Sequence, residues 1–187
     1  SICLEGLANH RGSAFGSFDT PQPTPINFEN NLACDYLQIS DNTIIFEDES
    51  RTIGRLVIPE KFYNKMCNSK IVLIEEPIEN RIQNIYDEYV KNYKHGKTLN
   101  NQSNELRLKL SKISKRLGGD NFKKVDILIK KAFENDDQNV HFQWIEILLN
   151  AYYDKMYDYQ LEKKIDRCEY SGTWESVKKY LISKNKQ

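Results

Sequence analysis

Short apolar runs alternate with helical periods in the first half of the sequence, and this alternation most constrains the fold. The runs that favour buried strands are residues 2–4, 43–46 and 71–74. Proline is favoured at the first position of a helix, and the helical segments open at Pro25, Pro59 and Pro77. Short β-branched runs suit a parallel sheet covered on both faces. Strand–helix alternation therefore predicts βαβ units and an α/β fold.

The second half of the sequence has little strand character. Residues 96–104 are polar and predict a loop, and residues 106–117 carry apolar side chains at helical spacing up to a stop at Gly118 and Gly119. Asp120 is expected to cap the next helix, and residues 166–170 to form a last strand. We therefore predict an α/β part over residues 1–95 and a mostly helical subdomain over residues 96–187.

The composition is that of a globular protein, and its net charge of zero does not indicate a particular binding partner. The chain of 187 residues has 27 Lys+Arg and 27 Asp+Glu, so any basic surface must be local. No apolar run reaches the roughly 20 residues that a membrane helix needs, so no membrane contact is expected. The cysteines lie far apart without a C-x-x-C pair, which predicts reduced, buried thiols and no metal cage. They are Cys3, Cys34, Cys67 and Cys168.

A glycine-rich stretch near the start carries the first candidate site. Glycines let the backbone turn tightly and approach a ligand, and an arginine offers a planar fork of donors for phosphate. We predict a loop that binds phosphate or diphosphate, with a histidine as donor or proton shuttle. Its residues are His10, Arg11, Gly12 and Ser13. The alternative is a structural loop in which His10 caps backbone groups and Arg11 pairs with Glu5 or Glu49. A functional loop so early also leads us to expect a preceding segment.

A second cluster of charged residues, residues 47–51, follows the second apolar run. Carboxylates at a strand end can orient Mg²⁺ or an attacking group near phosphates. Glu49 and Arg51 are the preferred pair for this role. The alternative is an ion-paired turn, because Arg51 and Arg55 are close by.

At this point several segments together resemble one family, the bacterial tRNA 2-selenouridine synthases. The segments in order are LEGLANHRGSAFG from residue 4, PTPINFEN from 23, EDESRTIG from 47, EEP from 75 with Arg81, ISKRLGG from 113 and YYDKMYDYQ from 152. They extend over nearly the whole chain, and six segments in the right order are specific.

The resemblance implies a transferase that modifies tRNA. Sulfur in the wobble 2-thiouridine is replaced by selenium from selenophosphate, through an S-geranyl intermediate formed from geranyl diphosphate. It also implies an N-terminal rhodanese-like domain with an essential cysteine, and a C-terminal domain that begins with a P-loop. The sequence holds no G-x-x-x-x-G-K-[ST] motif. The chain therefore resembles the C-terminal domain from its second strand onward, a partial P-loop NTPase-like parallel sheet with helices. Because the rhodanese cysteine is absent, we expect no catalytic residue within this chain and no selenation by this chain alone. The resemblance also implies a cytoplasmic protein. The upstream domain is expected in the same or a separate chain.

Basic residues around the Gly118–Gly119 stop are the candidate contacts to the tRNA anticodon region. Three of them share one helical face by i, i+3, i+7 spacing, and acids are scarce nearby. The candidates are Lys109, Lys112, Lys115, Arg116 and Lys123. A solvated charged face is the alternative. For Tyr152, Tyr153, Tyr157 and Tyr159 we favour packing over base stacking.

Two other functions remain open on the sequence. One is a tRNA-binding module that acts with a separate catalytic chain. The other is a P-loop-type phosphotransferase that acts on a small molecule and shares the acidic strand end.

Overall fold

The chain folds into two compact units in a computed structural model that describes residues 1–40, 43–92 and 98–184. Unit 1 comprises Ser1–Ile74 and Arg167–Gln187, and unit 2 comprises Glu75–Asp166. The boundary expected between residues 95 and 96 lies outside the described residues. The two units follow a different division, because the first helix after residue 74 packs within unit 2.

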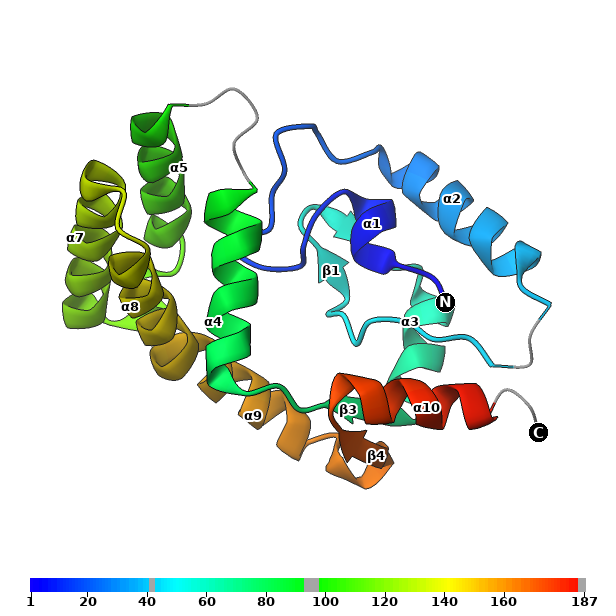
Figure 1. The fold of residues 1–187 in the computed structure, drawn as a ribbon. Coiled ribbons are helices and arrows are strands. Elements are labelled where there is room, and N and C mark those ends of the chain that lie inside the picture. Colours follow the sequence, from blue (N-terminus) through cyan, green and yellow to red (C-terminus); the bar gives the residue numbers. More distant parts are fainter. Residues whose placement is uncertain (41–42, 93–97, 185–187) are drawn as a thin grey trace. The chain divides into compact units, whose positions relative to one another are not determined.

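Unit 1 is an α/β unit with short strands (Figure 1). Its elements are α1 (Leu4–Ala8), α2 (Pro25–Gln38), β1 (Thr52–Ile53), β2 (Leu56–Val57), α3 (Glu60–Cys67), β3 (Ile71–Ile74), β4 (Cys168–Gly172) and α10 (Trp174–Lys184). β3 and β4 pair in parallel, with Val72 opposite Tyr170 and Ile74 opposite Gly172. β1 and β2 form an antiparallel hairpin, and α10 packs against both β3 and β4. The fold class predicted from the alternation is confirmed, within a chain that is mostly helical.

Two of the expected strands are wrong. Residues 2 and 3 lead directly into α1, which begins at Leu4, and residues 43–46 belong to no helix or strand. The Ile2 N–H donates to the Ile45 carbonyl over 3.0 Å. The apolar side chains of both segments are used in the core rather than in a sheet, since Ile44 and Phe46 pack against it. The parallel sheet among the described residues therefore consists of β3 and β4 alone.

The helix starts expected at the prolines are confirmed. Thr24 caps α2, with its side-chain oxygen accepting from the Asn27 N–H over 3.2 Å. Pro59 and Pro77 stand at the caps of α3 and of α4 in unit 2. The core of unit 1 is built from α1, α2 and the β1–β2 hairpin with its flanks. Its buried residues are Ile2, Leu4, Ala8, Phe28, Leu32, Ile53, Leu56 and Ile58.

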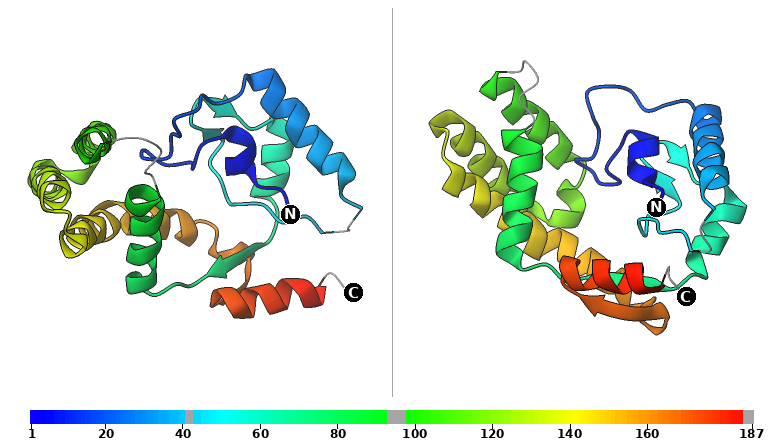
Figure 2. Two further views of the ribbon diagram at one scale, coloured as in Figure 1. Left: turned by 45° about the horizontal axis from the view of Figure 1, so that its top comes forward. Right: turned by 45° about the vertical axis from the view of Figure 1, so that its right-hand side comes forward.

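Unit 2 is entirely helical in its described residues. Its elements are α4 (Ile78–Tyr86), a π-helical turn (Asp87–Lys91), α5 (Leu99–Ser111), α6 (Ser114–Leu117), α7 (Gly119–Asn135), α8 (Gln138–Leu148), a second π-helical turn (Leu149–Tyr153) and α9 (Asp154–Glu162), followed by a short 3-10 turn (Ile165–Arg167). Figure 2 shows α5, α7 and α8 side by side, and α7 packs against both of the others. The predicted mostly helical subdomain is confirmed as part of the fold class, although the helical unit covers Glu75–Asp166 and not residues 96–187.

Details of the helix boundaries in unit 2 differ from expectation. α5 already begins at Leu99, because Thr98 caps it by accepting from the Asn101 N–H over 3.3 Å. Residues 98–104 are therefore mostly helical, and residues 96 and 97 lie outside the described residues. The helix expected over residues 106–117 is interrupted at residues 112–113. Gly118, not Asp120, occupies the cap position of α7.

A neutral histidine stands in the core of unit 2. His141 is 3% exposed, and its Nδ1 accepts a hydrogen bond from Trp144 Nε1 over 3.0 Å. The rings of Tyr86 and Phe133 lie 5.6 and 4.6 Å from the imidazole. Burial lowers the pKa of His141 from 6.5 to about 4, against a smaller opposing effect of Asp136 and its neighbour. The imidazole is therefore a structural group.

The pH dependence of stability follows from this histidine. Its folded-state pKa is lower than its unfolded value, so the unfolded chain binds the extra proton between pH 6.5 and 4. We expect its contribution to be complete above pH 6.5 and to fall by about 3 kcal/mol on acidification to pH 4. Urea unfolding between pH 4 and 8 measures this loss. His141→Gln should flatten that part of the profile, and His10→Gln is the control that should retain it.

Candidate functional site

The glycine-rich stretch forms a tight loop over residues 10–17 that closes on Gly16. The Arg11 N–H donates to the Gly16 carbonyl over 2.9 Å, and the Gly16 N–H donates to the Ser13 carbonyl over 3.0 Å. A Cβ on Gly16 would lie 2.9 Å from the Arg11 carbonyl carbon, so the turn requires glycine there. The loop thus brings together the predicted residues His10, Arg11, Gly12 and Ser13.

Asn9 fixes the start of this loop. It ends α1 in the left-handed conformation, with φ 48° and ψ 48°. Its Nδ2 donates to the Thr20 carbonyl over 3.0 Å, to Thr20 Oγ1 over 2.8 Å and to the Pro21 carbonyl over 3.2 Å. His10 and Ser17 then form an isolated antiparallel bridge. Both ends of the loop are therefore held by backbone partners.

Gln22 links the loop to the β1–β2 hairpin. Its Nε2 donates to the Ala8 carbonyl over 3.0 Å and to the Ile53 carbonyl over 2.9 Å. Its Oε1 accepts from the Arg55 N–H over 2.9 Å, and the Arg55 guanidinium donates back to the Gln22 carbonyl over 2.7 Å. A Cβ on Gly54 would overlap the Gln22 amide, and Gly54 also has φ +61°. Arg55 therefore stabilises the hairpin through Gln22, and its hydrogen bonds with Gln22 do not involve the acids of residues 47–49.

Arg11 is the cation of the loop. Its guanidinium carbon lies 4.3 Å from the centroid of the Phe18 ring, a cation–π distance. The side chain is half-buried. A guanidinium oriented on a ring face still presents its planar edge to an anion.

Glu49 lies directly over the loop. A Cβ on Gly12 would stand 2.7 Å from both carboxylate oxygens of Glu49, and Gly12 has φ +60°. The structure thus brings together the two segments that the sequence predicted, residues 10–13 and residues 47–51. Glycine at position 12 lets the Glu49 carboxylate rest on the backbone.

The Glu49 carboxyl group resists ionisation. Burial raises its pKa above 4.5, and the negative charges of Glu47 and Asp48 raise it further, whereas a hydrogen bond with the Glu5 side chain lowers it. A hydrogen bond between two carboxyl groups requires a proton on one of them. A phosphate dianion next to Gly12 is therefore compatible with Glu49 when that carboxyl is protonated or when a cation lies between them.

Glu47 has a structural contact that the sequence did not reveal. Its Oε2 accepts from the Leu4 N–H over 2.8 Å at the start of α1, where Cys3 Sγ accepts from the Gly6 N–H over 3.2 Å. The hydrogen bond with Glu47, and then burial, raise the pKa of the Cys3 thiol. Cys3 is nonetheless exposed, and the expectation of buried cysteines is wrong, since Cys34 and Cys67 are exposed as well.

Arg51 lies at the edge of this arrangement. Its side chain is exposed, its carbonyl accepts from the Ile58 N–H over 2.9 Å, and its charge acts on Tyr63 of α3. The role of Arg51 in phosphate binding stays a prediction. Across residues 1–40, 43–92 and 98–184, no cluster of three or more His, Cys, Asp or Glu side chains is arranged to hold a metal ion.

Unit 2 presents most of the predicted basic residues at its surface. Lys112, Lys115, Arg116 and Lys123 are exposed, and they follow one another over the end of α5, α6 and the start of α7. Lys124 is exposed next to them. We call these five residues the basic cluster.

Lys109 does not belong to the basic cluster, contrary to the expected shared face. Its side chain is 6% exposed, and its Nζ lies 3.1 Å from Glu105 Oε1 one turn earlier. The interruption at residues 112–113 also ends the helical face that it was expected to share with Arg116. Lys109 is thus a buried, paired cation of the α5 interface.

Other charged and aromatic residues of unit 2 are engaged within the unit. Arg107 binds Asp126 through two hydrogen bonds of 2.6 and 2.8 Å, and Arg81 binds Asp154. These pairs link α5 with α7 and α4 with α9.

The tyrosines divide between packing and exposure. The rings of Tyr153 and Tyr157 stack with centroids 6.3 Å apart. Tyr157 and Tyr159 are 53% and 60% exposed, and Lys163 Nζ donates to the Tyr159 hydroxyl over 2.7 Å. Packing thus accounts for only part of this group.

The fold and loop define an α/β unit with a glycine-rich turn, joined to a helical unit. Residues 1–187 match the family described as the tRNA 2-selenouridine synthase AAA domain, and the chain belongs to this family. A tRNA 2-selenouridine synthase of Hydrogenovibrio crunogenus is 40% identical over 97% of this chain, and one of Pseudomonas putida is 38% identical over 99%.

The chain spans about half the length of these curated relatives, 52% and 55% respectively. A tRNA 2-selenouridine synthase of Shewanella piezotolerans is 38% identical over 97% of this chain, and the match covers 54% of that relative's length. No solved structure matches the chain significantly. No helix in the described part of the chain is long and apolar enough to cross a membrane.

The contact between Gly12 and Glu49 gives a stability prediction. Gly12→Ala should lower the free energy of unfolding by about 1–3 kcal/mol, because alanine is strained at φ +60° and its Cβ would overlap the carboxylate. Gly119→Ala is the matched control, since its Cβ meets no atom within 4 Å and its φ is not positive. Urea unfolding of both variants tests this, and an equal effect at the two sites would contradict the described contact.

Proposed function

We propose that the chain is part of an enzyme that replaces sulfur by selenium in the wobble 2-thiouridine of tRNA, giving 2-selenouridine in the cytoplasm. The observation that carries the proposal is the family match over residues 1–187, together with relatives named tRNA 2-selenouridine synthase. The proposed substrates are tRNA, selenophosphate and geranyl diphosphate, with a geranylated tRNA as intermediate. A rhodanese-like domain would supply the essential cysteine.

The loop over residues 10–17 supports an anion site of this enzyme. Arg11 supplies the charge and the donors, and the loop backbone turns closely enough to let a phosphate oxygen approach. His10 and Ser13 add side-chain donors within the same turn. Because Glu49 faces Gly12, we propose that a proton on Glu49 or a bridging Mg²⁺ accompanies the bound phosphate.

The basic cluster supports tRNA binding by unit 2. A protein with equal numbers of acidic and basic residues needs a local positive surface to bind a polyanion. Lys112, Lys115, Arg116, Lys123 and Lys124 supply five positive charges within 13 residues, and Asp120 is the one acid among them. We place the anticodon arm of the tRNA on this cluster.

Charge reversal tests the tRNA surface. Lys112→Glu, Lys115→Glu and Arg116→Glu combined should weaken tRNA binding by the chain at least tenfold. The slope of log K against log salt should also flatten by about 0.7–0.9 for each phosphate that the variant no longer neutralises. Lys178→Glu with Lys179→Glu on α10 is the matched control, because both residues are exposed and outside the cluster. Equal binding by the cluster variant and the control would exclude the cluster as the tRNA surface.

Nucleoside mass spectrometry tests the activity. The chain alone should produce no 2-selenouridine in tRNA supplied with selenophosphate and geranyl diphosphate. The chain joined to the N-terminal half of the Hydrogenovibrio crunogenus relative should produce it, and Arg11→Ala should reduce the rate at least tenfold. A folded fusion, verified by circular dichroism and tRNA binding, that forms neither geranylated nor selenated tRNA would overturn the proposal.

A further inference from the structure

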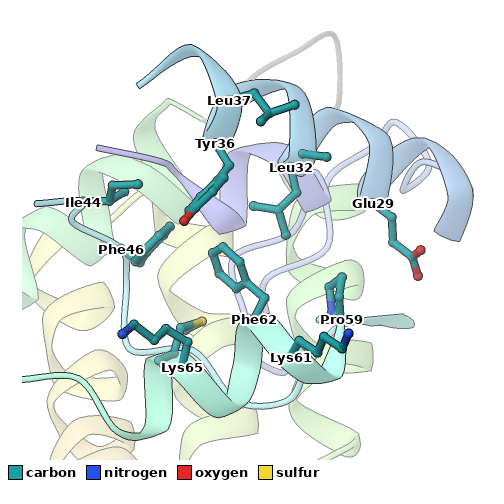
Figure 3. A pocket seen from close by; sticks show the side chains of 12 residues that line it. Glu29, Leu32, Tyr36, Leu37, Ile44, Phe46, Pro59, Lys61, Phe62 and Lys65 are labelled. Carbon is teal, nitrogen blue, oxygen red and sulfur yellow. The ribbon is translucent and has the colours of Figure 1, made fainter. Parts of the chain in front are cut away.

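An apolar groove lies between α2 and α3 in unit 1, and none of its lining residues belongs to the predicted site. Figure 3 shows side chains of both helices and of residues 44 and 46 directed into it. Its volume is about 610 Å³, within the range of small-molecule sites, which are mostly apolar clefts. The groove is therefore large enough for a small ligand, and its mostly apolar lining suits a hydrocarbon chain.

Aromatic rings form the walls of the groove. The rings of Phe46 and Phe62 meet edge to face with centroids 4.9 Å apart, and those of Tyr36 and Phe62 at 6.3 Å. Leu32 is buried at the base, whereas Tyr36 and Leu37 are exposed at the mouth. The rings hold each other in place, so the slot is formed without a ligand, and its mouth leaves apolar surface in water.

The mouth of the groove carries positive charge. Lys61 and Lys65 are exposed on α3, one helical turn apart, and both line the groove, against the single acid Glu29. Neither lysine forms an ion pair with any of the described residues. Two cations next to an apolar slot are complementary to a molecule with an anionic head and a hydrocarbon tail.

We propose that this groove binds the linear chain of an isoprenyl diphosphate, with its diphosphate head at Lys61 and Lys65. The choice of ligand rests on the proposed function, because geranyl diphosphate is the one substrate there with an apolar chain. Phe46, Phe62 and Leu32 contact the chain, and Tyr36 lies over it. This assignment leaves the loop at Arg11 for the second anion, selenophosphate.

Filling the groove provides the first test. Ala33 is an exposed lining residue of α2, so Ala33→Trp occupies the groove without disturbing the core. It should weaken binding of geranyl diphosphate to the chain at least tenfold by isothermal titration calorimetry. Asn31→Trp is the matched control, because Asn31 is exposed on the same helix and does not line the groove. Equal affinities of the two variants, or no binding by the unaltered chain, would overturn the proposal.

The head-group assignment has its own test. Lys61→Glu with Lys65→Glu should weaken geranyl diphosphate at least tenfold and leave geraniol binding unchanged, whereas Lys178→Glu with Lys179→Glu should change neither. Loss of both ligands in the lysine variant would contradict the assigned head position.

The groove and the overall activity can fail separately. In the active fusion, Ala33→Trp should raise the KM for geranyl diphosphate and leave the affinity for tRNA unchanged. An unchanged KM would reject the groove while the proposed function stands. Groove-dependent binding of geranyl diphosphate without any selenation would reject the function while the groove stands.

Discussion

The side-chain amide of Gln22 is the interaction on which the arrangement of the candidate site depends. It bonds the end of α1, at the Ala8 carbonyl, to the β1–β2 hairpin at the Ile53 carbonyl and the Arg55 N–H. The glycine-rich loop leaves α1 immediately after Ala8, and residues 47–51 lead directly into the hairpin. One amide therefore fixes both segments that meet at Gly12 and Glu49. It also provides hydrogen-bond partners for the Ala8 and Ile53 carbonyls and the Arg55 N–H.

The sequence predicted well those elements whose cause is local. Helices opened by Thr24 with Pro25, or by Pro59 and Pro77, are where they were expected, because caps and prolines act within one turn. It failed at α1, where the Glu47 carboxylate, 43 residues away, accepts from the Leu4 N–H beside the local cap by Cys3. A short apolar run such as residues 2–4 suits a strand and a helix start equally, and only the distant partner decides.

The candidate site shows the same division. The sequence predicted residues 10–13 and Glu49 as phosphate-site candidates, and the structure brings them together, with glycine at the position where the carboxylate lies. It also assigned Lys109 to a tRNA surface, whereas the structure buries Lys109 against Glu105. An acid four residues earlier was a visible signal for that pair, but the burial depends on packing of α5 against α7. The groove between α2 and α3 had no sequence signal, since its lining residues match ordinary core periodicity.

The division of unit 1 into two chain segments has a consequence for folding. β3 and β4 are neighbours in the sheet, yet Ile71 pairs with Cys168 across the whole of unit 2. Closing an unstructured loop of that length costs conformational entropy, and strand pairing over such a separation is slow. Unit 2 has mostly short-range helical contacts, so its prior folding shortens the effective loop and lets β4 find β3. We therefore expect the parallel sheet to form after unit 2 has folded.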